Sequence, residues 1–112
     1  MRRRADFDRV FQQGRHNSAR LLALRSVPNE AQWTRCGYAV PKRVGNAVTR
    51  NLVRRRLREI TRSLPVAEGY DLVISVRAEA AQATFAALKA ELMLLLKRAR
   101  LLEAPAEPRS RS

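Results

Sequence analysis

The feature that most constrains the fold is the stretch from Asn46 to Pro65, which predicts one long amphipathic helix. Asn46 is a favourable N-cap residue, and Pro65 closes the helix because proline cannot continue the hydrogen-bond ladder, so we expect an end near Ser63. At about 100° per residue, four apolar side chains fall on one stripe: Val53, Leu57, Ile60 and Leu64. A helix with such a stripe is stable mainly when it is packed, so the remaining chain must cover it.

A ladder of arginines descends beside the apolar stripe. Its members are Arg50, Arg54, Arg58 and Arg62, with Arg55 at the far edge and Asn51 inside the arc. A solvated face normally interleaves acids at this spacing, because like charges four residues apart destabilise a helix. Here only Glu59 lies within the helix, and we expect it to project away from the ladder. The pattern therefore indicates a polyanion lying across this face.

The charge of the whole chain supports a polyanionic partner. Lys and Arg number 23 against 10 acidic residues, which gives a formal net charge of +13 over 112 residues. Such self-repulsion destabilises a compact domain unless it is neutralised. Nucleic acid is the first candidate partner, and an anionic membrane surface is the second. No apolar run is long enough to span a membrane and no signal peptide opens the chain, so we expect a cytoplasmic location.

A short helix is predicted near the N-terminus, with Asp6 as its N-cap. Phe7, Val10 and Phe11 share one face of this helix, which stops before Gly14. The two aromatic side chains are either core residues or the border of a groove in which unpaired bases stack. Both readings stay open at this point.

Three strands and a last helix complete the prediction. Strand patterns at Arg20–Val27 and Trp33–Val40, joined by a turn at 28–30, suggest a hairpin. Tyr70–Val76 (YDLVISV) is a mainly apolar run and suggests a central strand. A helix is expected from about Ala80 to Leu102, with a core-facing stripe of Phe85, Leu88, Leu92, Leu95, Leu96, Ala99 and Leu102.

The element order α-β-β-α-β-α predicts an α/β (α+β) two-layer sandwich, with helices against a small mixed sheet. We expect residues 1–103 to form a single RNA-binding domain and residues 104–112, rich in Pro, Ser and Arg, to be a disordered tail.

No catalytic constellation is apparent in the sequence. His16 is the only histidine and Cys36 the only cysteine, and the acids are scattered without metal-ligand spacing. We therefore expect no catalytic residue and no metal site on the chain itself.

The segment KRVGNAVTRNLVRRRLRE, Lys42 to Glu59, resembles the signature of the bacterial ribonuclease P protein subunit. The family's Arg-Asn, Lys/Arg-Arg and final Arg are matched by Arg50-Asn51, Arg54-Arg55 and Arg58. The early DFDRVFQQG from Asp6 to Gly14 is also similar, and Arg20 matches a basic residue that begins the next strand.

This resemblance implies a left-handed βαβ crossover and a role in endonucleolytic removal of the 5′ leader from precursor tRNA. The catalytic centre and its Mg²⁺ ions would belong to a large RNA. The arginine motif would dock on that RNA, and a cleft between the long helix and the sheet would hold the single-stranded leader. The RNA-binding residues implied are Phe7, Phe11, Arg20, Lys42, Arg43, Asn46, Arg50, Asn51, Arg54, Arg55 and Arg58.

The main alternative is a ribosome-associated or general RNA-binding protein with no role in an enzyme, which explains the charge but not the spaced motif. A DNA-binding regulator is weaker, because no short helix and turn precede the long helix. A membrane-surface protein lacks support, because the basic helix has no broad exposed apolar face.

Overall fold

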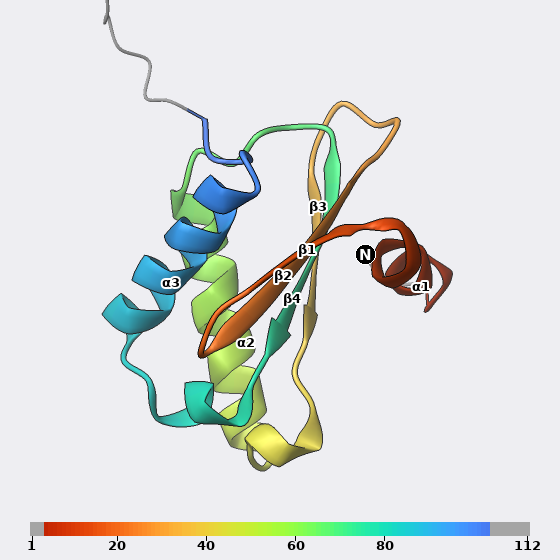
Figure 1. Cartoon of the computed structure of the whole chain (residues 1–112). Coiled ribbons are helices and arrows are strands. Elements are labelled where there is room, and N and C mark those ends of the chain that lie inside the picture. Colours follow the sequence, from red (N-terminus) through yellow and green to blue (C-terminus); the bar gives the residue numbers. More distant parts are fainter. Residues whose placement is uncertain (1–3, 104–112) are drawn as a thin grey trace, which may run out of the picture.

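Figure 1 shows the computed structural model, which describes residues 4–103. In chain order the elements are α1 (Arg4–Gln13), β1 (Arg15–Ser18), β2 (Leu22–Pro28), β3 (Arg35–Ala39), the 3₁₀ helix η1 (Lys42–Val44), α2 (Ala47–Ser63), β4 (Tyr70–Val76), the 3₁₀ helix η2 (Ala78–Gln82) and α3 (Phe85–Arg98). The predicted order of helices and strands is confirmed, with β1 as an addition. The predicted tail at 104–112 lies outside the described residues.

The four strands form one mixed sheet in the order β1-β2-β4-β3. Strand β4 is central, as its apolar run predicts, and pairs antiparallel with β2 and parallel with β3. The predicted hairpin of β2 and β3 is therefore wrong, because β4 lies between them. The physical reason is burial. The side chains of β4 are buried along most of its length, and a strand in the middle of the sheet is the one that helices can cover on both faces.

Strand β1 escaped prediction because its sequence, RHNS, contains no apolar residue and no alternation. It forms by pairing antiparallel with β2, from the Arg15–Ser26 pair to the Ser18–Ala23 pair. Backbone pairing at a sheet edge, and not side-chain burial, defines this strand.

Helix α2 connects the parallel neighbours β3 and β4. Seen from the α2 side of the sheet with both strands pointing up, β4 lies to the left of β3 (Figure 1). The βαβ crossover is thus left-handed, as the family resemblance implied and against the strong general preference for right-handed connections.

Helices α2 and α3 lie together on one face of the sheet (Figure 1). The predicted stripe of α2 is confirmed, since Val53, Leu57 and Ile60 are fully buried in the main core and Leu64 packs at its edge. The N-cap is confirmed too, because Asn46 Oδ1 accepts the Thr49 N–H at 2.9 Å. The apolar stripe thus turns the arginine ladder of α2 away from the core.

Helix α3 is shorter than predicted. Thr84 caps it at its N-terminus, and the preceding residues form η2 instead of another helical turn. Leu88, Leu92, Leu95, Leu96 and Ala99 are buried as expected, whereas Phe85 is 40% exposed and does not belong to the core stripe. Phe85 is the first residue of the helix, where the chain has only begun to approach the sheet.

Helix α1 lies alone on the opposite face of the sheet from α2 and α3 (Figure 1). There Val10 packs with Val27 and Val73 in a second, small cluster, to which Phe7 and Ala39 contribute partly buried atoms. The helix already includes Arg4, so the prediction of Asp6 as N-cap is wrong. Asp6 lies in the first turn instead, where an acidic side chain is favoured by the helix dipole.

Candidate RNA-binding surface

The arginine ladder of α2 is accessible from solvent. Arg58, Arg62 and Arg55 are exposed, while Arg50 and Arg54 are half-buried. Within residues 4–103, no guanidinium of α2 lies within 4.0 Å of a carboxylate. These charges are therefore not neutralised by the protein, which leaves them available to phosphates.

Two members of the ladder are held in place by polar neighbours. Arg50 Nε donates to the carbonyl oxygen of Gly45 at 3.2 Å, and Arg54 Nη1 donates to Asn51 Oδ1 at 2.9 Å. These bonds use one donor group of each guanidinium, which has five N–H donors in all. The ladder is therefore partly preorganised and still has donors for RNA.

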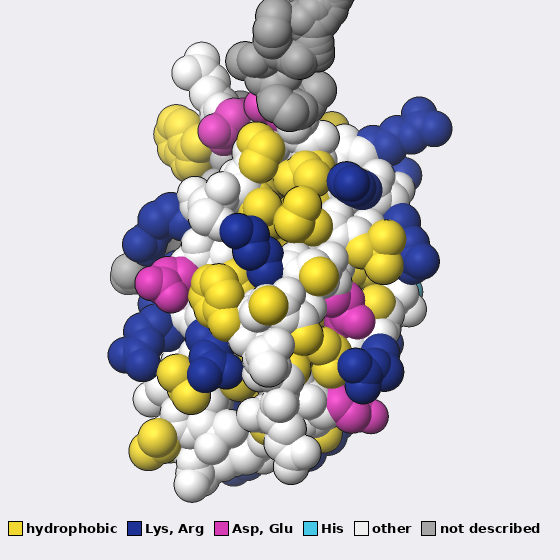
Figure 2. All heavy atoms as spheres, turned by 90° about the vertical axis from the view of Figure 1, so that its left-hand side faces the viewer, with side chains coloured by type: hydrophobic (Ala, Val, Ile, Leu, Met, Phe, Trp, Pro, Cys, Tyr) yellow, Lys and Arg dark blue, Asp and Glu magenta, His cyan; other side chains and the backbone are white. Residues whose placement is uncertain are grey.

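Glu59 departs from the prediction. It lines a shallow hollow together with Arg55, Arg58 and Arg62, so it does not project away from the basic face. One carboxylate among three arginines lowers the local charge without cancelling it. Figure 2 shows the side of the molecule covered by α2 and α3, where Lys and Arg side chains are spread among hydrophobic patches and outnumber the acidic ones.

The turn before α2 adds further positive charge. Lys42 and Arg43 are exposed on η1, directly before the N-terminus of the helix. The side-chain oxygen of Asn46 accepts the capping hydrogen bond from Thr49, so the side-chain amide nitrogen of Asn46 is the group left to contact RNA. The predicted Lys42, Arg43 and Asn46 are thus brought to one end of the ladder.

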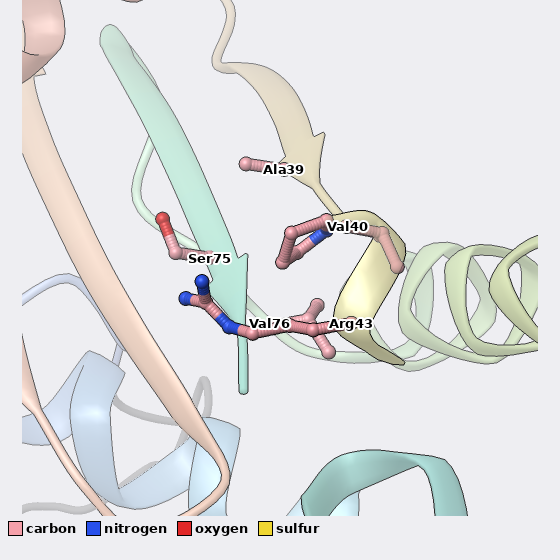
Figure 3. A pocket seen from close by; sticks show the side chains of 6 residues that line it. Ala39, Val40, Arg43, Ser75 and Val76 are labelled. Carbon is pink, nitrogen blue, oxygen red and sulfur yellow. The ribbon is translucent and has the colours of Figure 1, made fainter. Parts of the chain in front are cut away.

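Arg43 also reaches over the end of the sheet. Together with Ala39, Pro41 and Ser75 it lines a hollow of about 300 Å³ where β3 and β4 end. In Figure 3 the Arg43 guanidinium points toward the Ser75 hydroxyl across this hollow. Because Ala39 also borders the cluster under α1, this hollow opens on the α1 face of the sheet.

The two phenylalanines of α1 have different environments. The tip of the Phe7 ring lies against Gly37 of β3, where an added Cβ would come within 2.6 Å of Cζ. Phe11 is 40% exposed, and the guanidinium of Arg25 lies 4.6 Å from its ring centroid. Phe7 is mainly a packing residue, whereas Phe11 presents a ring that a base can stack upon.

The expected cleft between the long helix and the sheet is not present. Buried side chains fill that interface, among them Leu57 of α2 with Leu72 and Ile74 of β4. The aromatic pair lies on the other face, beside α1. The apolar stripe buries the side of α2 that faces the sheet, so RNA cannot enter between this helix and the strands.

Arg20 is exposed but is not part of either group. It lines a separate hollow with Glu79, Gln82 and Thr84, between the start of β2 and the start of α3. Arg56, which the motif did not single out, is half-buried, and its Nη1 donates to the carbonyl oxygen of Ala83 at 3.3 Å. Arg56 therefore ties α2 to the start of α3.

Sequence reasoning missed Arg25 and Asp71. Arg25 gave no signal, because a lone Arg in an apolar strand is common on a half-buried face. Asp71 did give one: an acid inside the apolar run of a central strand must be paired, since burial of an unpaired carboxylate is costly. Arg35, Asn29 and Arg9 donate to it and hold the pKa of Asp71 at about 2, below its usual value, against the opposing effect of burial.

The remaining titratable groups give no reactive centre. Burial raises the pKa of the Cys36 thiol to about 11, an effect that a hydrogen bond with Tyr38 partly offsets. Within residues 4–103, no three His, Cys, Asp or Glu side chains are grouped so that they could hold a metal ion. In the same range, no helix is both long and apolar enough to cross a membrane.

Comparison with known proteins identifies the family of this chain. A family model described as Ribonuclease P matches residues 1–100. The Ribonuclease P protein component of Chloroflexus aggregans is 42% identical over 108 residues, covering 94% of this chain and 80% of the relative. That of a Roseiflexus species is 42% identical over 101 residues, covering 88% and 83%.

Solved structures show the same fold. The RNase P protein of Staphylococcus aureus superposes with a TM-score of 0.84 at 27% identity, covering 92% of this chain and 96% of that one. The RNase P protein of Thermotoga maritima gives a TM-score of 0.81 at 27% identity, covering 93% and 97%. From the match over residues 1–100 and the relatives at 42% identity, this chain belongs to the ribonuclease P protein family, which supplies the protein component of an endoribonuclease.

Proposed function

We propose that the chain binds the catalytic RNA of ribonuclease P and the 5′ leader of precursor tRNA, and so assists the cut that matures the tRNA 5′ end. Its family supports the subunit role. The observation that carries RNA binding is the face of α2, where arginines spaced four residues apart have no carboxylate within 4.0 Å inside residues 4–103. Such a face matches the regular spacing of phosphates better than the edges of bases.

The two RNAs would bind opposite sides of the chain. The ladder from Arg50 to Arg58, with Lys42 and Arg43 at its start, would dock on the catalytic RNA. The open face of the sheet beside α1 would receive the leader. This face offers the exposed ring of Phe11 next to Arg25, and it offers Arg43 at the end of β3 and β4. Stacking and backbone charge together are the usual means of holding a single strand.

We place the catalytic centre in the RNA subunit. The described residues offer no group of acids, histidines or cysteines for a metal, while a folded RNA offers many phosphate oxygens, the ligands that Mg²⁺ prefers. Mg²⁺ bound by the RNA would supply charge neutralisation at the cleaved phosphate. The protein's own residues would bind and orient the leader.

Reconstitution tests this proposal directly. The full chain, freed of RNA, should not cut precursor tRNA, whereas the chain with a bacterial ribonuclease P RNA and Mg²⁺ should cut it at the 5′ end of the mature tRNA. Metal-dependent cutting by the RNA-free chain would overturn the assignment of catalysis to the RNA.

A general RNA-binding or ribosome-associated protein is the competing function. Purification of the chain from its native cells, followed by sequencing of the RNA that comes with it, separates the two. We expect one dominant long structured RNA from the cytoplasm. A mixture of unrelated RNAs, or ribosomal RNA, would favour the competing function.

A further inference from the structure

Asp71 joins three parts of the fold through one buried carboxylate. Its side chain is fully buried on the central strand β4. Arg35 of β3 donates to it from Nε at 2.8 Å and from Nη2 at 2.6 Å, and Asn29, which follows β2, donates from Nδ2 at 2.9 Å. Arg9 of α1 donates from Nη2 to Oδ2 of the same carboxylate, the oxygen that also accepts from Arg35 Nη2. Helix α1 is therefore tied by an ion pair to the centre of the sheet.

Few contacts hold α1 on the sheet. Val10 is the only residue of its ten that is fully buried, and the cluster beneath it contains just Val27 and Val73 besides. A helix of this length is not stable by itself in water. Its angle on the sheet therefore depends on the small cluster, on Phe7 against Gly37, on the Arg9–Asp71 pair and on the longer contact of Asp6 with Arg35 at 3.7 Å.

A buried ion pair is a poor means of stabilising a fold, because removing charges from water offsets most of the attraction. Its best-attested use is to select one arrangement of elements over others. Here the Arg9–Asp71 pair selects the rotation of α1 about its axis. Arg9 precedes the buried Val10 and lies two residues before Phe11, so holding Arg9 in place also fixes the direction in which Phe11 points. A rotation of α1 would move Phe11 away from Arg25, which lies 4.6 Å from the ring centroid.

We propose that Asp71 is a positioning residue that, through Arg9, fixes α1 on the sheet so that Phe11 and Arg25 form a preorganised stacking site for single-stranded RNA. The identity of that strand as the leader rests on the proposed function. The fixing of α1 does not, because it concerns contacts within the chain.

The test uses Arg9→Met in the full chain, since Met keeps the apolar stem and is a good helix former. Asp71 itself is less suitable, because a change at a fully buried site risks unfolding the sheet. Arg4→Met is the matched control: it removes the same charge from an exposed position on the same helix and leaves Asp71 untouched. Arg9→Lys is the conservative variant, because an ammonium can still donate to the carboxylate.

The first readout is hydrogen–deuterium exchange of the α1 amides in the chain alone. We expect at least about tenfold faster exchange in α1 for Arg9→Met, with β4 unchanged, and near wild-type exchange for Arg4→Met and Arg9→Lys. Equal α1 exchange in Arg9→Met and wild type would overturn the proposal.

The second readout is the ratio of affinities of the reconstituted holoenzyme for precursor and mature tRNA. Arg9→Met should reduce the preference for precursor at least about fivefold, the effect of losing one base stack, and Arg9→Lys should restore most of it. An unchanged preference beside a loosened α1 would overturn the stacking site. If the wild-type holoenzyme has no preference for precursor, the proposed leader binding fails, and the exchange experiment alone decides the positioning role.

Discussion

The guanidinium of Arg25 lies over the ring of Phe11, 4.6 Å from its centroid, and joins β2 to α1 across the open face of the sheet. A cation at this distance from an aromatic face is attracted by the ring quadrupole. The pair leaves Phe11 40% exposed, so the contact orders the ring without covering it. The α1 face therefore presents an aromatic surface and a positive charge side by side.

Phe7 and Phe11 should separate stability from RNA binding. Phe7→Ala is expected to lower the free energy of unfolding by about 2 kcal/mol, because the half-buried ring fills the space over Gly37. Phe11→Ala should lower it by less than about 1 kcal/mol and should reduce the holoenzyme's preference for precursor over mature tRNA. Urea titrations of both variants and affinity measurements with Phe11→Ala check this. A folded Phe11→Ala chain with an undiminished preference would contradict a stacking role.

Local patterns in the sequence predicted the parts of the fold that local physics decides. The period of Val53, Leu57 and Ile60 identified the buried side of α2, and with it the exposed arginine ladder. The apolar run of β4 identified the central strand, because a strand with apolar side chains on both faces must be covered on both.

The features that were missed depend on contacts between distant segments. Whether β2 pairs with β3 or with β4 is decided by long-range burial, and the turn between β2 and β3 carries no information about a strand inserted later. The side of the sheet on which α1 packs is likewise not encoded in the stripe of α1 itself. The family resemblance implied a leader cleft next to α2, whereas the open face of the sheet lies beside α1.

The Cys36 thiol should react slowly with thiol reagents in the folded chain. Burial raises its pKa to about 11, so at pH 8 only about one molecule in a thousand carries the thiolate. We expect reaction with a disulfide reagent at pH 8 to be at least about a hundredfold slower than in urea, where the thiol titrates normally. A native rate equal to the rate in urea would contradict the partly buried placement of this side chain against the core.

Asp71 should make stability depend on pH in the acid range. Its pKa of about 2 in the folded chain lies below the ordinary value of 3.8, first because of the hydrogen bonds from Arg35. A carboxylate with a lowered folded pKa contributes stability above its unfolded pKa and loses it as pH falls through the folded value. We expect a contribution of about 2 kcal/mol at neutral pH, lost between about pH 5 and pH 2.

Urea titrations at pH 6 and pH 3 measure that contribution. Arg35→Met should flatten the pH dependence, because it removes the largest cause of the shift. Glu59→Gln is the control, since Glu59 is exposed and has no cation within 4.0 Å in the described part of the chain. Equal pH dependence in wild type and Arg35→Met would show that the ion pair does not stabilise the folded state.

The arginine ladder should behave as a docking surface whose loss weakens RNA binding without unfolding the protein. Replacing Arg54, Arg55 and Arg58 by Ala removes like-charge repulsion and keeps good helix formers, and none of the three lies in the core. Stability should therefore hold or rise slightly, while affinity for the catalytic RNA falls. Because each lost phosphate contact lowers the log–log salt slope by about 0.7 to 0.9, three contacts should lower it by roughly 2 to 3.

Asn51→Ala is the uncharged counterpart of this experiment. In the wild type, Asn51 Oδ1 accepts a hydrogen bond from Arg54 Nη1 at 2.9 Å. The substitution therefore releases the Arg54 guanidinium without removing a charge. Docking should weaken with little change in the salt slope, because the number of neutralised phosphates stays the same. RNA titrations across salt concentrations, with circular dichroism to confirm folding, distinguish the two effects. An unchanged slope in the folded triple variant would mean that these arginines face only solvent, and the catalytic RNA would then have to bind elsewhere on the chain.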